Sequence, residues 1–543
     1  MKRLNNMNKL KLFVLAIGLG TAAQAQTLQD ANKKTENERY DLARKDYQKL
    51  IQVDPTSVEN AFFFGNFYAT IGEKDSAITL WRKAGTINLE DKLAMVSAAK
   101  ALYFSGDTTT AGQQFCEIIK KTKRKNPVVL HRIAETYATG PVKNLKLAEA
   151  YLRDVVRLDP KNLDAYVLLG DVLLAQSNSN ASQATEQYNN ALAIDPNSAK
   201  VIVRKAQIYQ RVQNYKLANE EYKKAQAADP NYAPAYRENA ELNILFDQYA
   251  AAIDMWEKYL KLNDTDEARY RYASSIFGAK QYCNVLPQLD RLTKDGFTNM
   301  YTKRMLYYSL YECNEAKDSL RYVQALKAGE DFFKTVPKEK IISVDYKYLG
   351  MIYDKLGQEE KSIEQYYLAA AIDTAKGADY LSDIAKLYSE KKNYPKLIEV
   401  YTRKLNQFPS KMQATEYYEL GRAYYFGPKD YKMADSIFGR LVAVAPTFPG
   451  GYFWQARARV QLDLNNKPKV YLAQPQYESF LTALTPEDIA SGSYKSYMIE
   501  ASKYLGDYYV NSPAKDKAKA DAMWAKVLEL DPNDAQAKAY LKK

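Results

Sequence analysis

The chain has 543 residues, of which 46% are hydrophobic and 26% are charged, so it is long enough and apolar enough to fold around a large core. Its 46 Tyr, 18 Phe and 4 Trp contrast with a single His, which excludes multi-histidine metal sites and most catalytic sites built on histidine. The formal net charge of +12 indicates a basic protein.

The first 25 residues have the pattern of a secretory signal peptide. Basic residues precede a short apolar stretch at residues 12–20, and residues 23–25 (AQA) form a small-x-small cleavage site. Removing this segment lowers the formal charge from +12 to +8. The residue directly after the cleavage site is Gln26 and not a cysteine, and no later run is long and apolar enough for a transmembrane helix. We expect a periplasmic protein, with secretion or peripheral binding to the outer membrane as alternatives.

Aromatic residues then recur with a period of about 34 residues. Tyr47, Trp81 and Phe115 are 34 residues apart in succession, and a second series has the same spacing. A small residue stands four positions earlier, one helical turn away. These pairs include Ala43 with Tyr47, Ala77 with Trp81, Ala111 with Phe115, Ala184 with Tyr188, Ala218 with Tyr222, and Ala252 with Trp256. Such a period indicates an array of repeats.

Two further signals divide each repeat into two helices. A proline lies eight residues after several of the aromatics, often in the dipeptide Asp-Pro, as at Asp54-Pro55 and Asp195-Pro196. Proline cannot continue a helix, and we expect the aspartate to cap the next one. Upstream of the small residue, large-small pairs such as Leu169-Gly170 and Leu420-Gly421 mark a second helical pattern.

These residues resemble the tetratricopeptide repeat family, whose pattern is W-x2-L-G-x2-Y, then A-x3-F, then P. The resemblance covers nearly all of the chain after residue 25 and implies an all-α solenoid, a superhelix of about fourteen helix-turn-helix units. We expect units to begin near residues 26, 58, 92, 127, 163, 199, 233, 267, 298, 343, 378, 414, 450 and 495. They would form an N-terminal array over residues 26–280, degenerate repeats with a hinge over 281–342, and a C-terminal array with a capping helix over 343–543.

Several segments depart from the pattern. Residues 29–39 are polar, and we expect a frayed cap there; residues 329–340 are expected to be a linker. Residues 463–474 lengthen one inner turn, and long loops on repeats often bind. Cys116 is expected to be a small buried residue. Cys283 and Cys313 fall near the inner turns of consecutive units, which suggests a disulfide; two unpaired thiols are the alternative.

In the resembled family, the first helix of each hairpin lines an inner groove, which suits an extended peptide or a partner helix. The resemblance implies a partner-binding groove that includes Phe62, Asn66, Lys100, Tyr103, Phe104, His131, Arg211, Arg237, Lys347, Tyr418, Arg422 and Tyr425. The full set of groove positions carries both signs of charge, so a nucleic-acid channel is not expected.

No sequence motif indicates catalysis. His131 has no second His or Cys at a metal-ligand spacing, and neither a P-loop nor a G-x-S-x-G motif occurs. We expect no enzyme activity, no cofactor and no metal ion. By likeness, the protein would be an exported scaffold or adaptor that binds a protein or peptide partner of a cell-envelope complex, and its oligomeric state is left open. The alternative is a glycan-binding protein of a nutrient-uptake system, because some outer-membrane sugar-binding lipoproteins also use tetratricopeptide hairpins.

Overall fold

The structure is a computed structural model that describes residues 27–314, 316–373 and 375–542. Within these residues it consists of α-helices and three short 3-10 helices, without strands. The predicted signal peptide lies outside the described residues. None of the described helices is long and apolar enough to cross a membrane. The chain divides into two compact units, unit 1 (Met1–Met305) and unit 2 (Leu306–Lys543).

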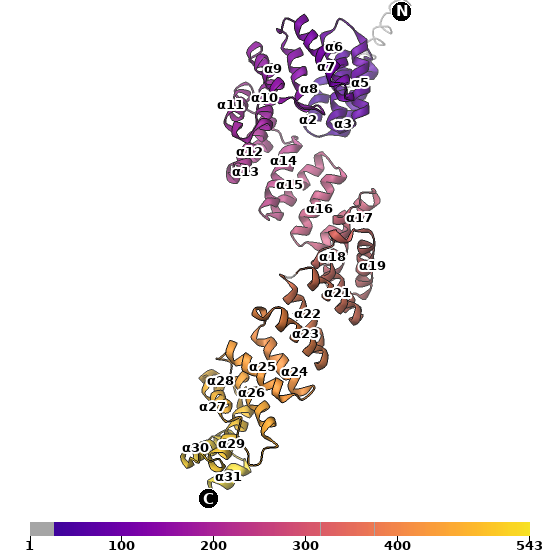
Figure 1. Cartoon of the computed structure of the whole chain (residues 1–543). Coiled ribbons are helices and arrows are strands. Elements are labelled where there is room, and N and C mark those ends of the chain that lie inside the picture. The colour runs from indigo at the N-terminus through magenta and orange to yellow at the C-terminus, as the bar shows by residue number, and fades with distance from the viewer. Residues whose placement is uncertain (1–26, 315, 374, 543) are drawn as a thin grey trace, which may run out of the picture. The chain divides into compact units, whose positions relative to one another are not determined.

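Unit 1 is built from helical hairpins in chain order (Figure 1). Its helices are α2 (Leu28–Glu36), α3 (Tyr40–Val53), α4 (Val58–Thr70), α5 (Lys74–Ile87), α6 (Lys92–Ser105), α7 (Thr108–Lys121), α8 (Pro127–Thr139), α9 (Leu145–Leu158), α10 (Leu163–Gln176), η1 (Asn178–Asn180), α11 (Ala181–Ile194), α12 (Ala199–Arg211), α13 (Tyr215–Ala228), α14 (Ala233–Leu245), α15 (Tyr249–Leu262), α16 (Asp266–Gly278) and α17 (Tyr282–Lys294).

The boundary between the units falls within α18 (Met300–Glu312). Unit 2 continues with α19 (Ser319–Thr335), η2 (Lys338–Lys340), α20 (Ser343–Lys355), α21 (Glu359–Ile372), α22 (Gly377–Glu390), α23 (Tyr394–Gln407), η3 (Pro409–Lys411), α24 (Ala414–Phe426), α25 (Tyr431–Val444), α26 (Pro449–Asp463), α27 (Gln474–Ala483), α28 (Pro486–Ala490), α29 (Lys495–Asn511), α30 (Lys517–Leu530) and α31 (Ala535–Leu541).

The predicted helical array is confirmed. Among the described residues, fourteen hairpins begin at α2, α4, α6, α8, α10, α12, α14, α16, α18, α20, α22, α24, α26 and α29, each within two residues of its predicted start. Consecutive helices pack on each other, and first helices of neighbouring hairpins also touch, as α4 touches α6 and α6 touches α8. Within each unit, we call the face formed by the first helices of its hairpins the inner face of that unit.

Close packing of glycine against an aromatic ring explains the repeat pattern. A Cβ atom on Gly170 would lie 2.4 Å from Cε1 of Tyr188, and one on Gly421 would lie 2.5 Å from Cε1 of Phe438. Both rings are fully buried. A larger residue would push the two helices of the hairpin apart, so the large-small pair and the downstream aromatic depend on each other.

The role predicted for the Asp-Pro aspartates is wrong. Asp54 occupies the C-cap of α3 and does not cap α4. Its carboxylate accepts a hydrogen bond from the backbone N–H of Thr56 at 3.0 Å, which holds the turn. The N-cap of α4 is Ser57, whose side chain accepts from Asn60 N–H at 3.1 Å. The aspartate thus stabilises the turn between hairpins.

Three other local expectations need correction. Residues 29–39 are not frayed, because α2 is a regular helix that starts with a capping box between Thr27 and Asp30. The predicted linker at residues 329–340 is too long, since α19 continues to Thr335 and buries Gly329. Cys116 is exposed and not buried, because it lies one residue beyond the buried Phe115 on α7. The pairing of Cys283 with Cys313 and the hinge over residues 281–342 stay predictions.

The long inner turn of the thirteenth hairpin is held to α26. The Asp463 carboxylate accepts the backbone N–H groups of Val470 at 3.1 Å and Tyr471 at 2.7 Å. It also accepts from the side chain of Asn466 at 2.7 Å. One carboxylate therefore satisfies donors from both halves of the loop and folds it back on the end of the helix.

Candidate functional site

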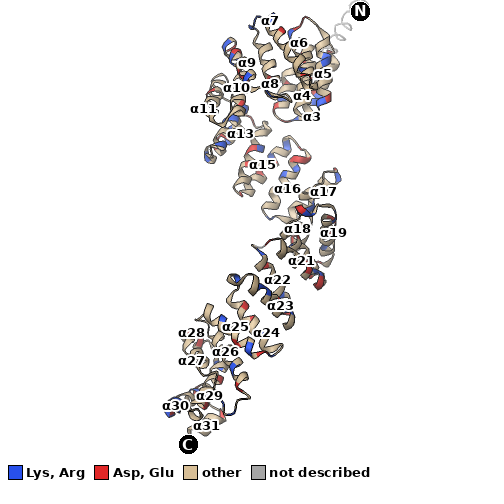
Figure 2. Ribbon diagram, in the orientation of Figure 1, with Lys and Arg blue, Asp and Glu red and all other residues tan. Residues whose placement is uncertain are grey.

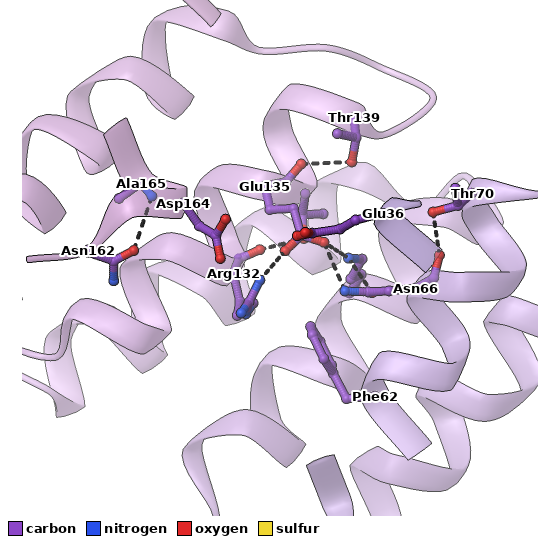
Figure 3. A network of polar contacts seen from close by, with 12 residues as sticks. Glu36, Phe62, Asn66, Thr70, Arg132, Glu135, Thr139, Asn162, Asp164 and Ala165 are labelled. Atoms are coloured by element: carbon purple, nitrogen blue, oxygen red, sulfur yellow. Dashed lines mark hydrogen bonds and ion pairs between the residues drawn. The ribbon is translucent and has the colours of Figure 1, made fainter. Parts of the chain in front are cut away.

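The inner face of unit 1 carries a network of polar side chains from three successive first helices. Lys100 on α6 donates from Nζ to Asn66 Oδ1 on α4 and to Glu135 Oε1 on α8, both at 2.8 Å. Asn66 Nδ2 also donates to Glu135 Oε1 at 3.0 Å, and Arg132 donates to Glu135 Oε2 at 2.7 Å. Figure 3 shows Asn66, Arg132 and Glu135 in this network. The predicted groove residues Asn66 and Lys100 thus bind each other and Glu135.

The network is held together by charge in a desolvated environment. Lys100 is 2% exposed, and its Nζ lies 4.7 Å from the centre of the Trp81 ring and 5.1 Å from that of Phe62. Burial lowers the pKa of the Lys100 ammonium, against the opposite influence of Glu135. Although burial also opposes ionisation of Glu135, Lys100 and Arg132 hold the pKa of its carboxyl well below the usual range.

Several predicted groove residues of unit 1 belong to its interior. Phe62 and Tyr103 are 0% and 3% exposed, and the Tyr103 hydroxyl donates to the carbonyl of Val142. Phe104 is half-buried with its ring centre 4.7 Å from that of Trp81. Neighbouring first helices approach so closely here that Phe62, Lys100 and Tyr103 offer little surface to a partner.

His131, another predicted groove residue, is also buried, and this gives a testable pH dependence. Burial, reinforced by Arg132, lowers the pKa of His131 to about 4, compared with about 6.5 in an unfolded chain. Between these values the unfolded chain binds a proton and the folded chain does not. The buried neutral imidazole therefore costs no free energy of unfolding above about pH 6.5. As the pH falls below that value, the free energy of unfolding decreases, by roughly 3 kcal/mol at about pH 4.

Urea unfolding of unit 1 measured from about pH 7 down to about pH 4.5 checks this expectation. A His131→Gln variant should lose most of the slope in this window, because the buried carboxylate of Glu135 titrates only at lower pH. An identical slope in the variant and the wild type would contradict the assignment to His131.

A cavity lies beside this network. It has a volume of about 300 Å³ and is lined by the inner face of α4, α8, α10 and α12, together with residues of α2 and α3. Its polar walls include Asn32 and Glu36 from α2, His131 and Glu135 from α8, and Lys200 from α12. Helix α2 therefore closes one side of the inner face of unit 1.

The two remaining predicted groove residues of unit 1 differ in exposure. Arg211 is exposed and donates only a long hydrogen bond, 3.4 Å, to Asn178. Arg237 is half-buried and forms an ion pair with Glu38, at 2.9 Å. Blue and red residues both occur along the ribbons of each unit (Figure 2).

In unit 2, Lys347 on α20 forms an ion pair with Asp383 at 3.2 Å and lies over the Tyr380 ring. The other predicted groove residues of this unit, Tyr418, Arg422 and Tyr425, lie on α24. They contact first helices of later hairpins, where Tyr418 accepts a hydrogen bond from Trp454 Nε1 at 3.1 Å and Tyr425 packs edge-on against the same ring.

We call the surface formed by Tyr418, Arg422, Phe426, Trp454, Arg457 and Tyr497 the arginine-aromatic surface. The Arg422 guanidinium lies 5.4 Å, 5.7 Å and 5.5 Å from the ring centres of Tyr418, Phe426 and Trp454. Arg457 lies over Trp454 and Tyr497. Stacking on ring faces leaves the edges of a guanidinium free to bind carboxylates.

The two arginines differ in their partners. Arg457 donates from Nε to Glu500 Oε1 at 2.9 Å. In the part of the chain that the structure describes, Arg422 forms no ion pair with an aspartate or glutamate, and it is exposed. Phe426 beside it is 41% exposed. Arg422 and Phe426 together offer a cation and an apolar ring to an incoming molecule.

Trp454 and Arg457 were not identified from the sequence. Trp454 lies 36 residues after Tyr418 and occupies the same position in the next hairpin. The spacing of the repeats could therefore have predicted that Trp454 lies next to Tyr418 on the inner face. Arg457 has no equivalent in α24, where Gly421 stands at that position. Its place over the rings depends on how two neighbouring first helices pack.

The fold defines a class of protein, a solenoid of stacked helical hairpins. The sequence profile of the tetratricopeptide repeat family matches residues 199–232 and 349–376. The C-terminal part of a TPR repeat-containing protein from Cytophaga hutchinsonii is 31% identical, covering 50% of this chain and 100% of that one, with a TM-score of 0.38. The chain belongs to the tetratricopeptide repeat family.

Two further solved structures share less sequence with the chain. A tetratricopeptide repeat protein from Parabacteroides merdae is 16% identical, covering 46% of this chain and 94% of its own, with a TM-score of 0.30. Yeast Tom70 is 13% identical, covering 64% of this chain and 91% of its own, with a TM-score of 0.29. No curated protein matches the chain.

Proposed function

We propose that this protein is an exported scaffold that binds a protein or peptide partner in the cell envelope and has no catalytic activity of its own. Membership of a repeat family typical of protein-interaction scaffolds supports binding, and the signal-peptide pattern of residues 1–25 supports export. The single observation that carries the proposal is Arg422, an exposed guanidinium stacked on three aromatic rings without a carboxylate partner among the described residues.

The arginine-aromatic surface selects for a particular kind of ligand. A carboxylate, from an acidic side chain or a chain end, can form two parallel hydrogen bonds with the free edge of Arg422. An apolar side chain next to that carboxylate would cover the exposed part of Phe426. The partner is therefore an extended segment in which an acidic group lies beside an apolar one.

A glycan-binding role has less support from this surface. Sugar rings stack on open aromatic faces, whereas Trp454 is 4% exposed and lies beneath both Arg422 and Arg457. Charged groups occupy the positions where a sugar would stack.

Replacing Arg422 by glutamine should weaken binding of such segments by about tenfold or more, because losing a charge-assisted hydrogen bond costs roughly 1.5–3 kcal/mol. Peptides are first selected from a random display library with the full wild-type chain, and their affinities are then measured for both proteins. The matched control is Arg440→Gln, since Arg440 is an exposed arginine on α25, the second helix of the same hairpin. Equal weakening by both substitutions, or selected peptides without carboxylates, would contradict the proposed surface.

A further inference from the structure

The turn that joins α2 to α3 lies against helices more than a hundred residues later in unit 1. Glu38, in this turn, receives hydrogen bonds from Arg237 on α14, from Nη2 to Oε1 at 2.9 Å and from Nε to Oε2 at 3.3 Å. The Tyr259 hydroxyl on α15 donates to Oε2 at 2.7 Å. At the end of α2, Glu36 pairs with Lys200 on α12 at 2.9 Å.

These donors form a site built for a carboxylate. Arg237 meets Glu38 with two neighbouring nitrogen atoms, one on each carboxylate oxygen, which is the bidentate geometry of strong arginine-carboxylate pairs. Burial works against the charged guanidinium, yet Glu38 raises the pKa of Arg237 above its ordinary value. Tyr259 is 4% exposed, so its hydroxyl is fixed in place. The carboxylate of Glu38 thus occupies this site, which indicates that the site binds carboxylates.

The contact of α2 with the starts of α10 and α12 is polar and loosely packed. A cavity of about 670 Å³ separates much of α2 from the starts of α10 and α12. The apolar cluster of the first hairpin, which includes Ala31, Tyr47 and Phe67, contains no residue beyond Leu80. The hairpin is anchored on α4 by apolar packing, while its distant contacts are ion pairs and hydrogen bonds that water and other carboxylates can replace.

We propose that α2 and its turn are a built-in occupant of a carboxylate-binding site formed by Lys200, Arg237 and Tyr259, and that an acidic segment of a partner protein displaces them. The free site would take a segment with two acidic residues spaced as Glu36 and Glu38 are. It lies in unit 1, so it does not depend on the arginine-aromatic surface of unit 2.

The probe for this site is a fluorescently labelled synthetic peptide with the sequence of residues 27–39, added to the full chain. A chain with Glu36→Gln and Glu38→Gln should bind the peptide at least tenfold more tightly than wild type, because its own turn no longer competes. Adding Arg237→Gln should abolish this binding, whereas adding Arg422→Gln in unit 2 should leave it unchanged. Equal affinity of wild type and variant, or absence of binding to the variant, would overturn the proposal.

Two further measurements guard against effects on folding. Tyr259→Phe removes a hydroxyl that donates to Glu38 and accepts from Asn263 but keeps the buried ring, so it should weaken peptide binding severalfold with unchanged far-ultraviolet circular dichroism. In the wild-type chain, excess peptide should accelerate hydrogen exchange of backbone amides in α2 and leave those of α4 unchanged. Full peptide binding by Tyr259→Phe, or unaltered exchange in α2, would also contradict displacement.

Discussion

Replacing Lys404 by methionine is expected to lower the free energy of unfolding of unit 2 by about 3–5 kcal/mol. Lys404 on α23 and Glu416 on α24 are 2% and 6% exposed, and Nζ lies 2.6 Å from Oε1 and 2.8 Å from Oε2. Without the ammonium group, Glu416 would remain a buried carboxylate with only neutral donors, Ser382 and the Gln413 N–H. An uncompensated buried charge is among the most destabilising changes that one substitution can make.

Hydrogen exchange of amides in α22 to α25 measures this loss locally. The double variant Lys404→Met, Glu416→Leu should recover most of it, because both charges are then gone and apolar side chains fill the space. Lys396→Met removes an exposed pair with Glu399 and should cause no measurable change. A single variant as stable as wild type would show that Glu416 is not dependent on Lys404.

Replacing Trp81 by alanine should destabilise unit 1 by about 3–5 kcal/mol. Trp81 is 0% exposed, packs on Gly65, and donates from Nε1 to the Phe62 carbonyl at 3.1 Å. Its ring also supports the Lys100 ammonium. Alanine would leave a cavity and a buried cation without its aromatic neighbour.

Urea unfolding followed by hydrogen exchange in α4 to α6 tests this expectation. Trp81→Phe should be destabilised much less, since most of the volume is kept. A loss below about 1 kcal/mol for Trp81→Ala would mean that the site collapses around the smaller residue, and that the repeat core does not depend on this aromatic position.

The repeat architecture could be predicted because it depends on local patterns that recur. The spacing from Gly170 to Tyr188 places a small residue against an aromatic within one hairpin, and this relation repeats in unit after unit. Helix starts follow from it to within two residues. The role of Asp54 was misassigned because a C-cap and an N-cap are only a few residues apart in a short turn.

The binding surfaces could be predicted only in part. The family pattern places Lys100 and Asn66 on the inner face, but it does not tell how closely neighbouring first helices converge, and this convergence buries Lys100. Contacts such as Arg237 with Glu38 join residues 199 positions apart. They arise from small rotations between successive hairpins that add up along the array, and no local sequence pattern encodes that sum.

Photo-crosslinking in intact cells tests the proposed scaffold role most directly. A photoreactive amino acid replaces Phe426, which is 41% exposed beside Arg422, or Met433, which is 39% exposed on α25. We expect a discrete adduct with a partner protein from position 426, lost when Arg422→Gln is added, and none from position 433. The same adducts from both positions, or adducts from position 426 that persist with Arg422→Gln, would contradict the account.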